Sequence, residues 1–229
     1  MIKKFLFQKH TDAKTTVAKN FAWLAISQVG SRLIKAFVTI YAARVLGAAG
    51  YGVFSYALAL SGFFIFFKNI GVDAILTREI AKKPENERAL IATSFWIEFA
   101  LLAVTTLLIL FVAPIFSNIK DATILLPLIA VVLVFDDLRD MSVAYFRGKE
   151  EMQLEAAVVV VGNIAVAAFG FMALLIHPTP FSFMLAYAGS SVVGWTVSVL
   201  LLHKKIPAFL KYFEKKLVIP ILKSALPLA

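Results

Sequence analysis

One stretch of the chain decides the fold, and it runs from residue 27 to residue 54: SQVGSRLIKAFVTIYAARVLGAAGYGVF. It reads as a long apolar helix that ends at a glycine-rich turn, yet Arg32 and Lys35 lie near its middle. Ser27 and Ser31 share a face with them by helical spacing. A charge at the centre of a bilayer costs about 2.5–3.5 kcal/mol on insertion scales, so such residues usually face a bundle interior. The stretch therefore predicts a membrane helix with one polar face.

The composition of the whole chain is typical of a membrane protein. Of its 229 residues, 61% are hydrophobic and 16% are charged, and the mean hydropathy is +0.86. Soluble domains are about 45–50% apolar and about 25% charged. The apolar excess collects in blocks of about twenty residues, which is the length that crosses a bilayer core. The sequence therefore predicts an all-α, polytopic transmembrane helix bundle.

Six of these blocks are complete, and a seventh begins near Leu217. We place the spans at residues 20–46, 51–68, 90–113, 122–145, 153–176 and 181–202. The expected organisation is a basic segment (1–19), a six-helix lobe (20–202), an amphipathic interfacial helix (203–216) and the truncated start of a seventh span (217–229). The interfacial helix is expected because apolar residues recur at helical spacing among lysines in KKIPAFLKYFEKKL.

Basic residues alternate between rich and poor loops. The N-terminal tail, the 68–89 loop and the 203–216 segment each hold five Lys or Arg residues, and Arg147 and Lys149 follow the fourth span. The remaining loops hold none, except for one lysine. The positive-inside rule therefore places the N-terminus and every basic loop in the cytoplasm, with the chain in the plasma (inner) membrane. The net charge of +9 is thus explained by topology, and nucleic acid is not an expected partner.

Further charged residues fall within the predicted spans. Asp136, Arg139 and Asp140 share one face of the fourth span by their spacing, whereas Asp137 is turned away from the latter two. The third span carries Glu98. At about 1.5 Å per residue, Glu98 and Asp140 both lie about 10–12 Å from the predicted cytoplasmic ends.

Two interpretations of these charges stay open. In the first, acids and bases form buried ion pairs that hold the bundle together, because unpaired charges are rare inside membranes. In the second, the charges line a hydrated cavity in which Arg32 and Lys35 bind an anionic ligand. Both can hold for one protein, if one conformation pairs the charges and another frees them for a substrate.

An enzymatic interpretation must also be weighed. DDLRD, residues 136–140, matches the DDxxD pattern by which some prenyltransferases hold Mg²⁺ and a diphosphate. Such enzymes need a second Asp-rich motif, which this chain lacks, and Arg139 would repel a cation. The chain has no cysteine, and its three histidines do not form an HExxH pattern. We therefore expect no metal, no cofactor and no catalytic residue.

Several segments together resemble a known family. They are ARVLGAAGYGVFSYALA (43–59), NIGVDAILTREIA (69–81), AYFRGKEEM (144–152) and LKSALPLA (222–229). The chain resembles the polysaccharide biosynthesis proteins, which are the O-antigen and lipid-linked oligosaccharide flippases of the multidrug/oligosaccharidyl-lipid/polysaccharide exporter superfamily. The likeness covers essentially the whole chain and does not identify a sugar.

This resemblance implies a two-lobed fold whose V-shaped cavity opens alternately to the two membrane faces. The implied substrate is a polyprenyl-diphosphate-linked oligosaccharide, which the family moves from the cytoplasmic to the outer leaflet. The basic residues implied to bind its anionic head group are Arg32, Lys35, Arg78 and Arg139. The acidic residues expected as cavity counter-ions or gating groups are Glu98, Asp136 and Asp140.

The chain is shorter than the family pattern, since it covers one lobe and stops within the seventh helix. We therefore expect an N-terminal fragment, or a second lobe supplied by another chain. The close alternative is a lipid II flippase, and a cation-coupled multidrug exporter of the same superfamily is less favoured because the first span is basic. The prenyltransferase is the least favoured alternative.

Overall fold

The computed structural model describes residues 13–66, 68, 70–82, 86–203 and 211–225, with side chains from residue 22 onward. This part of the chain is built from helices. Its seven helices of more than ten residues are α2 (Ala13–Ile65), α3 (Val72–Lys82), α4 (Glu87–Leu107), α6 (Leu126–Gly148), α7 (Met152–Ile176), α8 (Pro180–Leu202) and α10 (Lys215–Ala225). A π turn and a 3-10 turn extend α4 to Phe116, and the four-residue α5 (Lys120–Thr123) follows.

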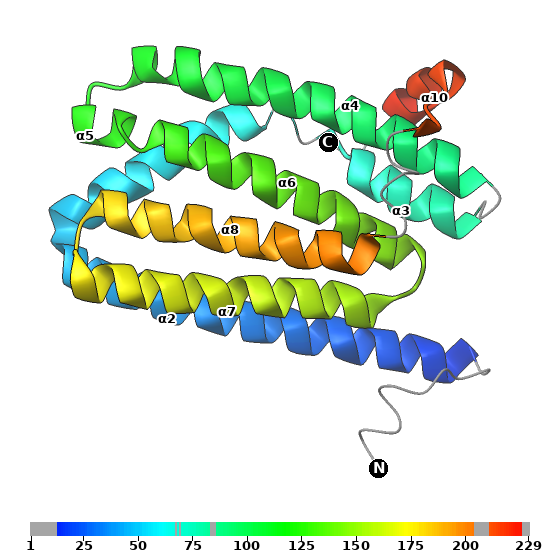
Figure 1. Ribbon diagram of the computed structural model, residues 1–229, viewed down its shortest axis with the longest axis horizontal. Helices are drawn as coiled ribbons and strands as arrows, with labels where there is room; N and C mark the ends of the chain where they lie inside the picture. The colour runs from blue at the N-terminus through cyan, green and yellow to red at the C-terminus, as the bar shows by residue number, and fades with distance from the viewer. Residues whose placement is uncertain (1–12, 67, 69, 83–85, 204–210, 226–229) are drawn as a thin grey trace.

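The longest helix, α2, is bent at Gly47. The backbone of Gly47 has φ 68° and ψ 177°, a combination that is almost restricted to glycine. Figure 1 shows that the second arm of α2 runs back from this bend toward α3. The glycine-rich turn expected at residues 46–51 therefore begins with a true break in the helix.

Four helical segments are long and apolar enough to cross a membrane within the described part of the chain. They are Ala22–Ile65, Glu87–Phe116, Met152–Ile176 and Pro180–Leu202. Within the described residues, the prediction of an all-α fold with helices long and apolar enough to cross a membrane is confirmed. Only four described segments, and not the six spans expected, are long and apolar enough to cross a membrane, for two reasons. Both arms of α2 are counted as one segment, Ala22–Ile65, although the helix is broken at Gly47, and α6 carries four charged residues between Asp136 and Asp140.

The long helices lie side by side, and their connections gather at two ends. At one end Figure 1 shows α3, the α6–α7 turn, the end of α8 and α10; at the other it shows the α2 bend, α5 and the α7–α8 turn. The first end carries Arg78, Lys82, Arg88, Arg147 and Lys149, and we call it the basic end. The loops that are rich in basic residues along the sequence therefore lie together at one end of the bundle.

Close helix packing is made possible by small residues. The Cα atoms of Gly162 and Gly194 face each other across α7 and α8, where an added Cβ on either would lie 3.9 Å from the other. At Gly148 an added Cβ would lie only 3.0 Å from the Cβ of Ile80, so α3 packs directly on the end of α6. Small residues at membrane helix interfaces let the backbones approach in this way.

The C-terminal helix lies against the basic end. Residues 204–210 of the expected interfacial helix lie outside the described residues, and α10 begins at Lys215. Ile221 and Ala225 of α10 are buried against Val72, Ile75 and Ile97 of α3 and α4. The segment that we expected to start a seventh span therefore has an apolar contact with the lobe.

The bend at Gly47 gives a first testable prediction. Replacing Gly47 by alanine should destabilise the folded lobe by about 1–3 kcal/mol, because the positive φ is strained for any residue with a Cβ. Gly52→Ala is the matched control, since Gly52 lies in the same helix with open space around it. The midpoint of unfolding in mixed detergent micelles should fall for Gly47→Ala and not for Gly52→Ala. Equal midpoints for the two variants would contradict the requirement for glycine at the bend.

Candidate functional site

The charged residues of the bundle form two neighbouring clusters. We call Asp136, Arg139 and Asp140 the α6 triad. We call Lys68, Asp73, Glu98 and Asp137 the α3 cluster, because it joins α3 to α4 and α6. Both clusters include residues of the DDLRD motif, so α6 connects them.

The α6 triad is held by its central arginine. Arg139 donates from Nη1 to Asp136 Oδ1 at 2.7 Å, and from Nη2 and Nε to Asp140 Oδ1 at 2.7 and 2.9 Å. The side chains are 23% exposed for Arg139, 35% for Asp136 and 49% for Asp140. The sequence spacing predicted that these three residues share a face, and in the structure they do. Their net charge of −1, when all are ionised, leaves room for one further cation.

That further cation is Lys35. Lys35 of α2 and the Ser191 hydroxyl of α8 are both close enough to Asp136 to act on its carboxylate electrostatically. The contact between α2 and α7 is polar as well, because Asn163 Nδ2 donates to Ser31 Oγ at 2.8 Å. A polar track therefore leads from the first arm of α2 to the α6 triad.

Arg32 and Lys35 themselves lie exposed on the surface of the lobe. Among the described residues, neither is joined to a carboxylate by an ion pair within 4.0 Å. By contrast, Ser27 and Ser31 of the same helix are buried. The polar face predicted for this helix is thus divided: its serines pack inside the lobe, and its cations lie on the lobe surface.

The α3 cluster is more deeply buried. Lys68 Nζ forms an ion pair with Asp137 Oδ1, with side chains that are 12% and 3% exposed. Asp73 and Glu98 are close enough to act on each other electrostatically, and Glu98 is buried. Glu98 and Asp137 also line the same narrow gap between α4 and α6.

The structure places the predicted site residues in three locations. Lys35 lies near Asp136 of the α6 triad, which also contains Arg139. Arg32 is exposed on α2, one turn before Lys35, and Glu98 lies close to Asp73 of α3. The guanidinium of Arg78 lies at the basic end, where it is 57% exposed and its Nε is 3.8 Å from Glu79 Oε1. The equal depth that we expected for Glu98 and Asp140 therefore does not bring Glu98 into a described contact with the basic residues of α2.

Several charged contacts were missed by the sequence reasoning. Asp73 seemed isolated in the sequence, but it meets Glu98 in the fold. Glu155 is fully buried and forms an ion pair with Arg147 across the α6–α7 turn. Lys149 Nζ lies 2.7 Å from Glu87 Oε2. A carboxylate just inside an apolar helix, next to a basic loop, was the available signal for Glu155.

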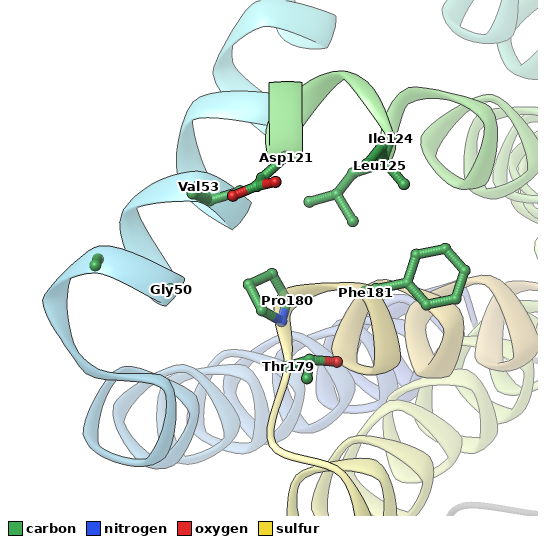
Figure 2. Close-up of a pocket in the computed structure, with 9 residues that line it drawn as sticks. Gly50, Val53, Asp121, Ile124, Leu125, Thr179, Pro180 and Phe181 are labelled. Atoms are coloured by element: carbon green, nitrogen blue, oxygen red, sulfur yellow. The ribbon is translucent and has the colours of Figure 1, made fainter. Parts of the chain in front are cut away.

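A separate pocket lies at the end opposite the basic end. It has a volume of about 350 Å³ and lies between the second arm of α2, α5 and the start of α8. Figure 2 shows Asp121 on one wall, facing Pro180 and Phe181 on the other. Asp121 is the only charged residue among those that line it in the described part. No predicted site residue lines this pocket.

The contacts of the DDLRD motif disfavour a metal site. Asp136 and Asp140 each bind Arg139, and Asp137 binds Lys68. A carboxylate that neutralises a protein cation offers little to Mg²⁺, which prefers free oxygen ligands.

Comparison with known proteins gives one match. The family described as "Polysaccharide biosynthesis protein" matches residues 17–229, which is nearly the whole chain. No curated protein and no solved structure matches. The resemblance noted in the sequence is therefore confirmed at the level of the family. The chain belongs to the polysaccharide biosynthesis protein family, a family of membrane transporters of the multidrug/oligosaccharidyl-lipid/polysaccharide exporter superfamily that act as flippases.

Proposed function

We propose that the chain is the first lobe of a translocase for lipid-linked oligosaccharides. It works by alternating access and exports polysaccharide repeat units across the plasma (inner) membrane on a polyprenyl-diphosphate carrier. The family supports a role in polysaccharide export. The observation that carries the proposal further is the exposed Arg32–Lys35 pair, which has no ion-pair partner within 4.0 Å among the described residues.

A diphosphate fits this pair chemically. A guanidinium binds phosphate oxygens through two parallel hydrogen bonds, and an ammonium adds a mobile point charge. Residues i and i+3 of a helix project to the same side, so Arg32 and Lys35 can reach one head group together. The sugar then crosses through the hydrated cavity, while the polyprenyl tail stays in the hydrocarbon.

The α6 triad supplies the counter-charge in this mechanism. Without substrate, the carboxylate of Asp136 draws Lys35 toward α6. A bound diphosphate competes for the same ammonium, and Arg139 keeps its contacts with Asp136 and Asp140. A ligand that binds one arrangement better than the other shifts the population of the two conformations. Arg78, which lies outside this track, serves as an entry residue for the head group at the basic end.

Alternating access also needs a second lobe. Transporters of this kind move one half against the other around a site at their interface. In the proposed complex, the second lobe covers the face of α2 that carries Arg32 and Lys35. It is supplied by a C-terminal continuation or by another chain, and membrane lipids cover the apolar surfaces that remain.

We further propose six crossings with the N-terminus and the basic end in the cytoplasm. The two arms of α2 cross separately because the chain turns back at Gly47, and α6 crosses although it is charged. The separation of basic loops from the opposite end supports this orientation. A cation-coupled drug exporter is less consistent with the basic pair, whereas a lipid II flippase would share the diphosphate chemistry.

Single-cysteine labelling tests the six crossings, since the natural chain has no cysteine. Ala48→Cys, Asn118→Cys and His177→Cys lie at exposed positions opposite the basic end and should react with a membrane-impermeant thiol reagent in intact cells. Glu151→Cys, in the α6–α7 turn, should react only after the membrane is permeabilised. Labelling of Asn118→Cys and Glu151→Cys from the same side would show that α6 does not cross.

Charge removal tests the binding role of the basic pair. Arg32→Ala and Lys35→Ala should each lower surface polysaccharide about tenfold or more when expressed with the second lobe in a flippase-deficient strain. The reason is that a hydrogen bond to a charged group contributes about 1.5–3 kcal/mol. Arg44→Ala is the matched control, because Arg44 is an exposed arginine of the same helix near the bend.

Both basic-pair variants should insert into the membrane at wild-type levels, as judged by immunoblotting of membrane fractions. Wild-type amounts of surface polysaccharide in both variants would refute the role of the pair. Rescue of a strain that lacks its lipid II flippase, with no rescue of the polysaccharide defect, would assign the substrate to lipid II instead.

A further inference from the structure

The pocket opposite the basic end is large enough for a small ligand or a lipid head group. Its volume is about 350 Å³, and its walls come from the second arm of α2, from α5 and from the start of α8. Ligand pockets in proteins measure about 300–1,000 Å³. Figure 2 shows Asp121 of α5 on one wall, with Pro180 and Phe181 of α8 on the other.

The carboxylate of Asp121 has no counter-charge in the described part of the chain, where no Lys, Arg or His lies within 4.0 Å of it. On the opposite wall, Thr179 Oγ1 is bonded to Ser182, with its N at 3.1 Å and its Oγ at 2.9 Å. Pro180 has no N–H to donate. The walls of the pocket therefore leave the charge of Asp121 for a positively charged ligand.

An unpaired cation lies next to this carboxylate. Lys120 precedes Asp121 in α5 and is exposed, and no carboxylate among the described residues lies within 4.0 Å of it. Consecutive residues of a helix point about 100° apart, so the two charges face different parts of a ligand. A zwitterionic ligand, which carries an ammonium and a phosphate a few bonds apart, matches both of them.

The rim of the pocket is apolar and exposed. Ile124 of α5 and Phe181 of α8 line the pocket and are 58% and 47% exposed. Ile115 and Phe116, just before α5, are exposed as well. Phe116 ends one segment of membrane-spanning length, and Phe181 lies at the start of another. Because exposed apolar patches mark contacts with a partner or a membrane, we expect the ligand to carry apolar chains.

We propose that this pocket binds an aminophospholipid of the leaflet at this end of the bundle. Its primary ammonium group pairs with Asp121, its phosphate pairs with Lys120, and its acyl chains lie on Ile124 and Phe181. A primary ammonium donates charge-assisted hydrogen bonds to a carboxylate. A choline group has no N–H and is recognised by a cage of aromatic rings. Phe181 is the only aromatic residue that lines the pocket in the described part, so a primary amine fits better.

A lipid at this position joins three elements of the lobe. Gly50 of α2 lies next to Pro180, since an added Cβ on Gly50 would be 3.7 Å from Pro180 Cγ. The lipid adds contacts with α5 to this approach. A ligand that binds only the folded protein stabilises it. The bound lipid therefore holds the second arm of α2 against the start of α8.

Native mass spectrometry tests the preference for the amine. The chain is purified in detergent and mixed with equal amounts of phosphatidylethanolamine and phosphatidylcholine. The wild-type chain should retain about threefold or more phosphatidylethanolamine, because an exposed ion pair contributes little more than this. Asp121→Asn should bind both lipids equally, whereas Asp121→Glu and Glu214→Gln should keep the preference. Glu214 is exposed and does not line the pocket.

Equal retention of the two lipids by the wild-type chain, or a preference that persists in Asp121→Asn, would overturn the proposal. Lys120→Gln is a second variant with a different expected result. It should lower the retention of both lipids and leave their ratio unchanged, because both carry a phosphate. Unchanged retention of both lipids would contradict the phosphate contact.

Cysteine protection tests whether the lipid occupies the pocket. Ala49 lines the pocket and Ala48 does not, although both are exposed. Dihexanoyl phosphatidylethanolamine should slow the reaction of Ala49→Cys with a small thiol reagent and leave Ala48→Cys unaffected. Glycerophosphoethanolamine, which has the head group without the chains, should protect neither. Equal protection of Ala49→Cys by both compounds would show a site for a soluble amine and contradict the lipid.

The leaflet is the outer one in the orientation proposed above, and only this assignment rests on the proposed function. Labelling of Ala48→Cys in intact cells by a membrane-impermeant thiol reagent supports the outer leaflet. Labelling only after permeabilisation would place the lipid in the cytoplasmic leaflet and contradict the proposed orientation. The mass spectra and the protection of Ala49→Cys would still decide whether the pocket binds an aminophospholipid.

Discussion

The packing of the helices is constrained by the high free-energy cost of placing an isolated charge in a medium without water. Inside a membrane such a charge needs an opposite charge, a hydrogen-bonding network or a hydrated cavity. The lobe uses ion pairs in most places: Arg139 binds two aspartates, Lys68 binds Asp137, and Arg147 binds the buried Glu155. Arg32 and Lys35 are different, because no described carboxylate lies within ion-pair distance of them. In our account, this difference separates residues that hold the fold from residues that bind substrate.

Helix α6 connects the two polar clusters. Asp136 and Asp140 face Arg139, and Asp136 interacts electrostatically with Lys35, whereas Asp137 faces Lys68. Consecutive residues of a helix point in directions about 100° apart, so one polar turn can serve two environments. A shift of α3 at the basic end would act on α6 through the packing of Ile80 on Gly148. The same helix carries Asp136, so its position determines the counter-charge near Lys35.

The sequence predicted features that depend on local spacing. The helical class, the break near Gly47, the shared face of the α6 triad and the turned-away Asp137 all follow from periodicity within one segment. The partners of Lys68 and Asp73 could not be predicted in this way, because they come from other helices and depend on how α3 packs. The number of spans also differs: the apolar blocks of the sequence predict six, whereas four described segments are long and apolar enough to cross a membrane. The two arms of α2 meet directly at the break at Gly47 and count as one segment, and the charges of α6 lower its hydropathy.

The central claim is that Arg32 and Lys35 face water within the membrane, while their neighbours on α2 face lipid. Single cysteines at 32 and 35, and at the exposed positions Leu33 and Phe37, allow a direct test in the cysteine-free chain together with its second lobe. The measurement is the rate of reaction with a small water-soluble thiol reagent, because the reactive thiolate forms only in contact with water. The account predicts fast reaction at 32 and 35 and little at 33 and 37. Equal rates at all four positions, or no reaction at 32 and 35, would contradict it.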